Sequence, residues 1–200
     1  MKSIRFLRHA ESAANAGLPT SVPGEIPLTE AGRIAANVAA LDYEGPPPDL
    51  IVASPFRRAQ ETAVPFRTRF ATALVEKWPV QEFTYLSAAR FGASTAEERR
   101  PSVESYWRMA TPETNDGPGA ESFEDFIARV QTSLENLRSR SEQSVLIVCH
   151  EMFIKAAMWL ETRKPDFKLA HAPQRFRDFS LTFAIPNLGR WDCPTLPMPT

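Results

Sequence analysis

The chain has 200 residues, of which 43% are hydrophobic and 24% charged, a balance that is typical of globular proteins and excludes a disordered chain. Its formal net charge of −1 excludes a global positive field for nucleic acid or an anionic membrane, so any affinity for anions must come from a local cluster. Its two cysteines are too few for a disulfide framework, and no apolar segment resembles a signal peptide or a membrane span. We therefore expect a single domain over residues 1–200, in the cytoplasm, without nucleic acid or membrane partners.

The first predicted elements are a strand and a helix. Residues 4–7 form a short apolar run, broken only by an arginine, which predicts a strand that delivers Arg8 and His9 to a sheet edge. After a proline-rich loop, Thr29 is a residue type that caps helices. The apolar residues that follow recur at helical spacing and are expected to pack on the sheet: Ile34, Val38 and Leu41.

The next elements repeat this alternation. Residues 50–53 predict a second buried strand, and a helix is expected from Phe56 onward with a bend near Pro65. Residues 74–81 favour a third strand, although Pro79 interrupts the pattern and belongs at a strand end or sheet edge.

The second half of the chain begins with a segment of little periodicity. Residues 83–120 are rich in proline and glycine and are predicted to be an insertion or lid, with one helix around 103–109. From Ser122 a strongly amphipathic helix is expected, followed by a buried strand at 145–149 and a buried helix at 153–160. Strands that alternate with helices predict a three-layer α/β/α sandwich around a mostly parallel sheet.

Reactive and charged side chains stand at or just after the predicted ends of different strands: Arg8 and His9, Arg57 and Arg58, Glu82, and His150. Because ligands of such sheets bind beyond the carboxyl ends of the strands, we expect these side chains to share one pocket. Guanidinium groups bind phosphate oxygens, an imidazole is a competent nucleophile, and a carboxyl group can protonate a leaving oxygen. These residues indicate a phosphoryl-transfer site. We expect no metal and no other cofactor, because positioning and charge stabilisation provide most of the catalysis in that reaction.

Four segments resemble a known family. Residues 6–12, FLRHAES, resemble the Arg-His-Gly-Glu motif that opens the histidine phosphatases, also called the phosphoglycerate mutase-like superfamily. Residues 27–32, 54–63 and 145–157 are similar to its later signatures, and the match is weakest at 83–120. In the family the second arginine stands directly before an alanine, which selects Arg58 over Arg57.

This resemblance implies the catalytic roles. His9 is the nucleophile that forms a phosphohistidine, which water then hydrolyses. Arg8, Arg58 and His150 surround the phosphate. Glu82 is the acid that protonates the leaving group and then activates the water. The implied activity is that of a phosphatase acting on a phosphomonoester, with a small phosphorylated metabolite as substrate in preference to a phosphoprotein.

Further positions concern substrate binding and the departures from the family. The resemblance implies that Asn15 and Ser21 help to hold the phosphate. Ala10 stands where the family has a glycine, a change that costs energy only if that backbone needs a positive φ. Glu151 also replaces a glycine, beside the phosphate, where its carboxylate is expected to affect substrate choice. Glu11 and Glu151 are the rival candidates for the acid.

Two other functions remain open on the sequence. One is a phosphoglycerate mutase-type phosphotransferase, although such relatives carry longer insertions after the acid than residues 83–120 provide. The other is an inactive protein that binds a phosphorylated ligand without turnover. The sequence does not indicate an oligomeric state.

Overall fold

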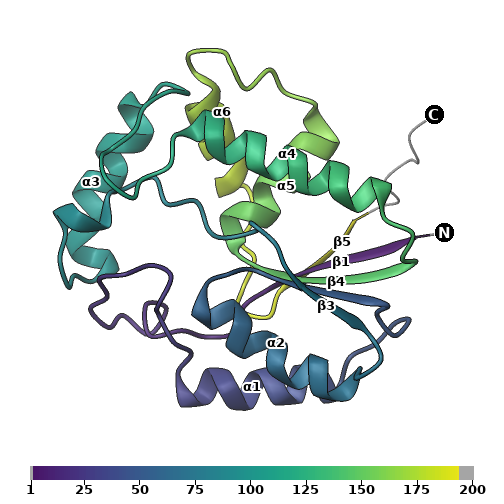
Figure 1. The fold of residues 1–200 in the computed structure, drawn as a ribbon. Helices are drawn as coiled ribbons and strands as arrows, with labels where there is room; N and C mark the ends of the chain where they lie inside the picture. The colour runs from purple at the N-terminus through teal and green to yellow at the C-terminus, as the bar shows by residue number, and fades with distance from the viewer. Residues whose placement is uncertain (1, 194–200) are drawn as a thin grey trace.

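The computed structural model of the chain describes residues 2–193. A five-stranded sheet in the order β3-β2-β4-β1-β5 separates two layers of helices (Figure 1). Strands β2 (Leu50–Ala53), β3 (Leu74–Lys77), β4 (Ser144–Cys149) and β1 (Ser3–Arg8) run parallel, and β5 (Arg190–Cys193) pairs antiparallel with β1. The predicted three-layer α/β/α sandwich with a mostly parallel sheet is confirmed.

The helices divide between the two faces of the sheet. Helices α1 (Glu30–Leu41) and α2 (Arg57–Arg69) cover one face, and α4 (Phe123–Ser139), α5 (Glu151–Arg163) and α6 (Ala172–Leu181) lie on the other (Figure 1). Helix α3 (Ala96–Met109) stands apart from both layers, on the side where the parallel strands end, and a short 3₁₀ turn at Ala88–Arg90 precedes it. None of the helices in the described part of the chain is both long and apolar enough to cross a membrane.

Helix α1 begins as predicted, since the Thr29 side chain accepts a hydrogen bond from the Gly32 N–H at 2.9 Å. The predicted packing face is wrong, however. Its residues are between 50% and 73% exposed: Ile34, Val38 and Leu41. The buried face consists of Gly32, Ala36 and Ala40. The reason is a close backbone approach, because a Cβ atom at Gly32 would lie 2.1 Å from the Glu11 carbonyl oxygen, so only the small-residue face fits against the neighbouring loop.

Other elements differ from the expected bounds. Strand β3 ends at Lys77, before Pro79, and does not continue to residue 81. Helix α3 begins at Ala96 instead of near residue 103, because Thr95 and Glu98 form a reciprocal capping box. Helix α6 and strand β5 were not expected, and β5 extends the sheet by packing Trp191 on Phe6 with ring centroids 5.2 Å apart.

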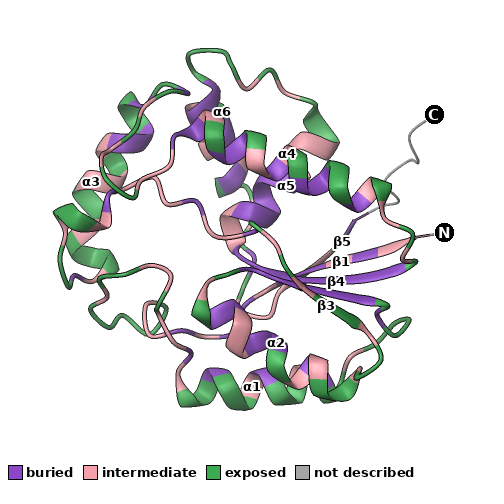
Figure 2. Ribbon diagram, in the orientation of Figure 1, coloured by how far each residue is buried: buried purple, intermediate pink, exposed green. Residues whose placement is uncertain are grey.

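The central strands are the most deeply buried part of the sheet (Figure 2). Strand β4 is buried along its whole length and lies between β1 and β2, so helices cover it on both faces. Such burial fixes the carboxyl ends of these three strands in a rigid core, and rigid elements hold catalytic groups more accurately than loops do.

Candidate active site

The carboxyl ends of three adjacent strands bring the predicted histidines together. Strands β1 and β4 pair with Arg8 opposite Cys149, so His9 and His150 leave the sheet side by side. The His9 N–H donates to the Cys149 carbonyl at 3.0 Å, and the two imidazole centroids lie 5.0 Å apart. On the other side of β4, Ser54 follows β2 and reaches His150 with its hydroxyl group. The register of the sheet therefore builds the centre of the site.

The imidazole of His9 is held so that Nε2 carries no proton. Its Nδ1 lies 2.7 Å from the Ala10 carbonyl oxygen, which accepts the Nδ1 proton and leaves a lone pair on Nε2. The Nε–H of Arg58 points at that lone pair from 3.0 Å. Burial, together with the positive charges of Arg58 and Arg8, lowers the pKa of His9 to about 3, so the ring is neutral at neutral pH. A neutral imidazole with an unprotonated Nε2 can act as a nucleophile once a bound oxygen takes over the Arg58 N–H.

The methyl group of Ala10 is tolerated without backbone strain. Ala10 is fully buried, and it is not among the non-glycine residues with a positive φ. Its N–H donates to the Thr62 hydroxyl at 3.1 Å, and that hydroxyl donates to the Arg58 carbonyl at 2.7 Å. The backbone that orients His9 is thereby tied to the helix that carries Arg58.

The second imidazole is oriented by a serine that the sequence reasoning missed. Nε2 of His150 lies 2.8 Å from the Ser54 hydroxyl, and the same hydroxyl oxygen accepts the Phe56 N–H at 3.2 Å. The hydroxyl group still has its hydrogen and a second lone pair for Nε2, so this contact fits either tautomer of the His150 ring. The Nδ1 atom of that ring is buried and has no hydrogen-bond partner among the described residues. Burial and the charge of Arg58 keep the pKa of His150 well below its usual range. The neutral form of His150 thus lies beside the His9 ring.

Arg58 and Arg57 occupy different environments. Arg58 is buried, and besides contacting His9 its Nη1 donates to the Pro23 carbonyl at 2.7 Å. Burial lowers its pKa to about 10, so the group remains charged at neutral pH. The Arg57 side chain is half exposed and pairs with Glu61 at 2.6 Å within helix α2. The geometry places Arg58, and not Arg57, at the histidines.

Arg8 approaches the site in company with Glu151. Its Nη1 pairs with the Glu151 carboxylate at 2.9 Å and also donates to the Ile185 carbonyl, while its Nε is buried without a partner among the described residues. The other oxygen of Glu151 pairs with Lys155 at 2.7 Å. The carboxylate that replaces a glycine is therefore compensated by two cations. The Glu151 carboxylate also partly neutralises Arg8, which weakens the attraction of Arg8 for a phosphate.

Glu82 is the carboxyl group that faces both the arginines and the adjoining pocket. Its Oε1 accepts the N–H groups of Met152 at 3.0 Å and Phe83 at 3.2 Å. Burial raises its pKa, against the opposing effect of the Arg58 charge. The neighbouring Phe83 ring stacks on Phe126 of α4 with centroids 4.4 Å apart, which anchors this segment to the core. A carboxyl group with a raised pKa, held in place by packing, suits a general acid.

The other predicted site residues, Ser21, Asn15 and Glu11, form no hydrogen bond to either histidine among the described residues. Ser21 lines the pocket beside Arg58, although it is exposed. Asn15 is exposed, and its side-chain oxygen accepts two hydrogen bonds from Ser12, at 3.1 and 2.9 Å. The rival acid Glu11 accepts the Thr29 hydroxyl at 2.7 Å. Among the described residues, no cluster of three or more His, Cys, Asp and Glu side chains is arranged to hold a metal ion.

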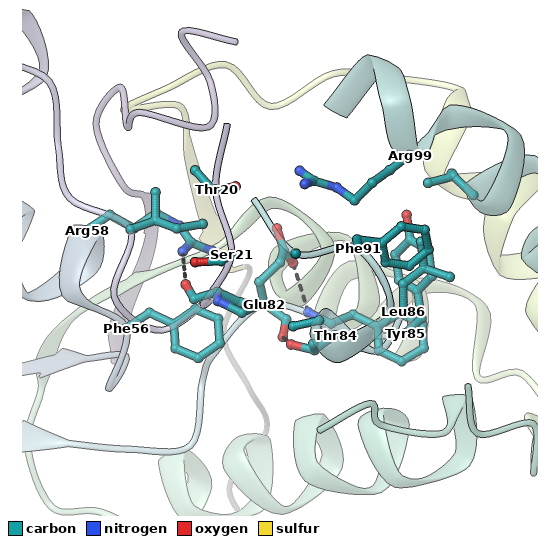
Figure 3. A pocket seen from close by; sticks show the side chains of 16 residues that line it. Thr20, Ser21, Phe56, Arg58, Glu82, Thr84, Tyr85, Leu86, Phe91 and Arg99 are labelled. Atoms are coloured by element: carbon teal, nitrogen blue, oxygen red, sulfur yellow. Dashed lines mark hydrogen bonds between the residues drawn. The ribbon is translucent and has the colours of Figure 1, made fainter. Parts of the chain in front are cut away.

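A pocket of about 190 Å³ opens from Glu82 and Arg58 toward the insertion. Figure 3 shows Arg58, Ser21 and Thr20 on one side of it and the side chains of the insertion on the other, with Glu82 between them. The segment 83–103 thus supplies most of the far wall. Because Arg58 lines this pocket and also contacts His9, the pocket adjoins the two histidines.

Comparison with known proteins gives one family. The model of the histidine phosphatase superfamily (branch 1) matches residues 4–190. A protein of Hydrogenobacter thermophilus, provisionally named phosphoserine phosphatase 2, is 29% identical over 162 residues, which cover 81% of this chain and 79% of that protein. An uncharacterized protein of Mycobacterium tuberculosis is 30% identical over 185 residues, covering 89% of this chain and 85% of the relative.

Solved structures share the fold. The mycobacterial glucosyl-3-phosphoglycerate phosphatase superposes with a TM-score of 0.69 at 22% identity, covering 94% of this chain and 88% of that one. A phosphoserine phosphatase of Entamoeba histolytica, in complex with 3-phosphoglyceric acid, gives a TM-score of 0.64 at 22% identity, with 95% and 89% covered. At this level of identity the superpositions establish the architecture and leave the substrate open.

Proposed function

The chain belongs to the histidine phosphatase superfamily and is a phosphatase, and we propose that it hydrolyses phosphomonoesters through a phosphohistidine formed on His9. The observation that carries this proposal is the state of the His9 ring. It is buried, neutral and oriented through Nδ1, with the Nε2 lone pair beside the Arg58 guanidinium. The Nε2 lone pair accepts the Arg58 N–H in this structure, and a phosphoryl oxygen can take that N–H in its place and leave Nε2 to attack phosphorus.

In the first step, Nε2 of His9 attacks phosphorus and the bond from phosphorus to the ester oxygen breaks. The proton of the Glu82 carboxyl group moves to the departing oxygen, so an alcohol leaves and Glu82 becomes a carboxylate. Arg58, Arg8 and the Nδ1–H of His150 donate to the three remaining phosphoryl oxygens, where charge is spread in the transition state. The Ala10 carbonyl stabilises the positive charge that develops on the imidazole.

In the second step, the Glu82 carboxylate takes a proton from water while the water oxygen attacks phosphorus. The bond from Nε2 to phosphorus breaks, inorganic phosphate leaves, and both His9 and Glu82 return to their starting states. One carboxyl group can serve both steps because it acts as an acid first and as a base afterwards. We propose no metal step, because two guanidinium groups and an imidazole N–H already supply the charge stabilisation.

The proposed substrate is a small phosphorylated metabolite. Relatives and structural neighbours are named for phosphoserine and for a glucosylated phosphoglycerate, and the pocket beside Glu82 has the volume of a small leaving group. We keep the cytoplasm as the proposed location, which cell fractionation would test.

The proposal is tested with a generic aryl phosphate in the presence of a chelator. We expect release of phosphate by the wild type, and a loss of at least about a thousandfold in kcat for His9→Ala, because the nucleophile is removed. His171→Ala is the matched control, since His171 is an exposed histidine that precedes helix α6 and does not line the pocket. Activity of His9→Ala equal to that of the control would exclude the mechanism.

The same assay separates the two alternatives. A mutase-type enzyme would transfer the phosphoryl group to a second hydroxyl compound faster than to water. A binding protein without activity would retain inorganic phosphate or the aryl phosphate and release no product.

A further inference from the structure

We propose that the pocket beside Glu82 selects substrates whose leaving alcohol has an apolar body, the size of one aromatic ring, that carries an anionic group, and that Arg99 binds this group. This inference rests on the proposed phosphatase function, because it assigns the pocket to the leaving group.

The walls of the pocket are predominantly apolar beyond the reacting end. Arg58 and Glu82 mark the reacting end. Phe56 also lies at this end, with its ring centroid 5.3 Å from that of His150. Beyond Glu82 the lining is formed by aromatic and aliphatic side chains of the insertion: Phe83, Tyr85, Leu86, Phe91 and Val103. The rings of Phe83 and Tyr85 lie with centroids 5.2 Å apart, so this wall is continuous with the aromatic core under the insertion. A leaving group with an apolar body gains free energy by burial here, whereas a polyhydroxylated one loses hydrogen bonds to water.

Arg99 contributes a positive charge at the far side of this apolar wall. It lies in the first turns of α3, and in Figure 3 its guanidinium extends over the pocket toward Thr20. Both side-chain hydrogen bonds of Arg99 use Nη1 and go to Ser94, to the carbonyl at 2.6 Å and the hydroxyl at 2.9 Å. Nη2 and Nε are therefore left for a ligand, and a guanidinium presents such N–H pairs to a carboxylate or phosphate.

Arg99 differs from its neighbours because it forms no ion pair among the described residues, although its charge is one of the causes that lower the pKa of the exposed Glu98. Arg90 pairs with Asp116 and Arg100 pairs with Glu97, whereas the side-chain partners of Arg99 are uncharged oxygens. Its position is also fixed, because the Ser94 carbonyl that holds it accepts the Thr20 N–H at 2.9 Å as well. A cation that is anchored by uncharged oxygens and directed over a pocket is arranged for an anion.

The same lining argues against a leaving group with an ammonium ion. Among the described residues that line the pocket, Glu82 carries the carboxyl group, and burial raises its pKa, which disfavours the charged form that would pair with an ammonium ion. A phosphoserine-like substrate would bring its ammonium group into a pocket where the positive charges of Arg58 and Arg99 repel it. We expect this chain to differ in substrate from relatives named for phosphoserine.

The test compares three aryl phosphates whose phenols differ in charge and little in size: those of 4-hydroxyphenylacetic acid, its amide, and 4-hydroxybenzylamine. With the wild-type chain we expect kcat/KM to be roughly 10 to 100 times higher for the acid than for the amide, the size of a hydrogen-bonded charge pair, and lowest for the amine. In Arg99→Gln the acid should fall to the level of the amide, mainly through KM. Arg100→Gln is the matched control and should keep the preference, because Arg100 is exposed and does not line the pocket.

The outcomes separate the two proposals. Turnover of all three esters with no preference for the acid, or an equal loss for acid and amide in Arg99→Gln, overturns the role of Arg99 and leaves the phosphatase proposal intact. No turnover of any ester by the wild type, with none of a generic aryl phosphate either, contradicts the proposed function itself.

Discussion

Replacing Ser54 by alanine tests whether the orientation of His150 matters to catalysis. In the tautomer that we propose for His150, the Ser54 hydroxyl donates to Nε2, 2.8 Å away, while it accepts the Phe56 N–H at 3.2 Å. Without it, Nε2 has no partner in either tautomer, so the ring proton is free to move to Nε2 and the ring is free to rotate. Either change removes the Nδ1–H that we assign to a phosphoryl oxygen.

The size of the effect follows from the cost of leaving a buried polar group unsatisfied, about 1–3 kcal/mol. If that free energy is lost from the transition state, kcat/KM falls about 5- to 140-fold. Steady-state kinetics on an aryl phosphate measures the change, and ¹⁵N NMR of the histidine ring nitrogens reports which one of His150 carries the proton. A structural role alone would lower stability and leave that tautomer unchanged.

Ser133→Ala is the matched control for this experiment. Ser133 is also a buried serine, but its hydroxyl donates to the Arg129 carbonyl within helix α4, on the outer layer of the sandwich. We expect a similar loss of thermal stability without a loss of kcat/KM. A Ser54→Ala variant within twofold of the wild type in kcat/KM would refute the reasoning about His150.

Three further predictions concern Glu82 as the acid, Glu151 as the partner of Arg8, and Gly32 in the fold. Since Glu82 must be protonated in the first step and burial raises its pKa, kcat/KM should fall as pH rises through that raised pKa. Glu82→Gln should lose this limb of the pH profile, which separates it from the titration of the substrate phosphate near pH 6. Glu151→Gln should free Arg8 and tighten inhibition by inorganic phosphate roughly fivefold, about 1 kcal/mol, in an inhibition assay; weaker inhibition would show that the carboxylate holds Arg8 in place. Gly32→Ala should lower the free energy of unfolding by about 1–3 kcal/mol in a denaturant titration, whereas Gly24→Ala, where the nearest atom is 3.7 Å away, should not.

The centre of the site was predictable because sequence position and sheet topology are linked. A residue directly after a buried parallel strand must emerge at the carboxyl edge, so the placement of His9 and His150 follows from recognising two strands. Ser54 carries the same signal, since it directly follows β2, but serine is common at strand ends and its partner is set by the order of strands in the sheet. Glu151 pairs with Lys155 one helical turn away, which a local pattern can suggest. Its contact with Arg8 depends on the packing of helix α5 against the end of β1, and no local pattern predicts it.

Helix faces and short elements were harder to predict. The apolar stripe of α1 suggested the wrong packing face, because backbone contact at Gly32 determines which side can approach the loop after β1. Strand β5 has four residues, too short for a periodicity argument, and it is stabilised by a tertiary contact between Trp191 and Phe6. Helix α6 does carry a local signal in Pro173 near its start, a position that favours proline.

Detection of the covalent intermediate is the most direct test of the proposed phosphohistidine mechanism. Glu82→Gln is mixed with an aryl phosphate whose phenol leaves without an acid, so that the first step proceeds while activation of water is impaired. The reaction is quenched in alkali, which preserves phosphohistidine, and the peptides are mapped by mass spectrometry. We predict one phosphoryl group per chain, on His9, and none in the matching His9→Ala double variant. Phosphate release with no phosphoryl group on His9, or a phosphoryl group on another residue, would contradict it.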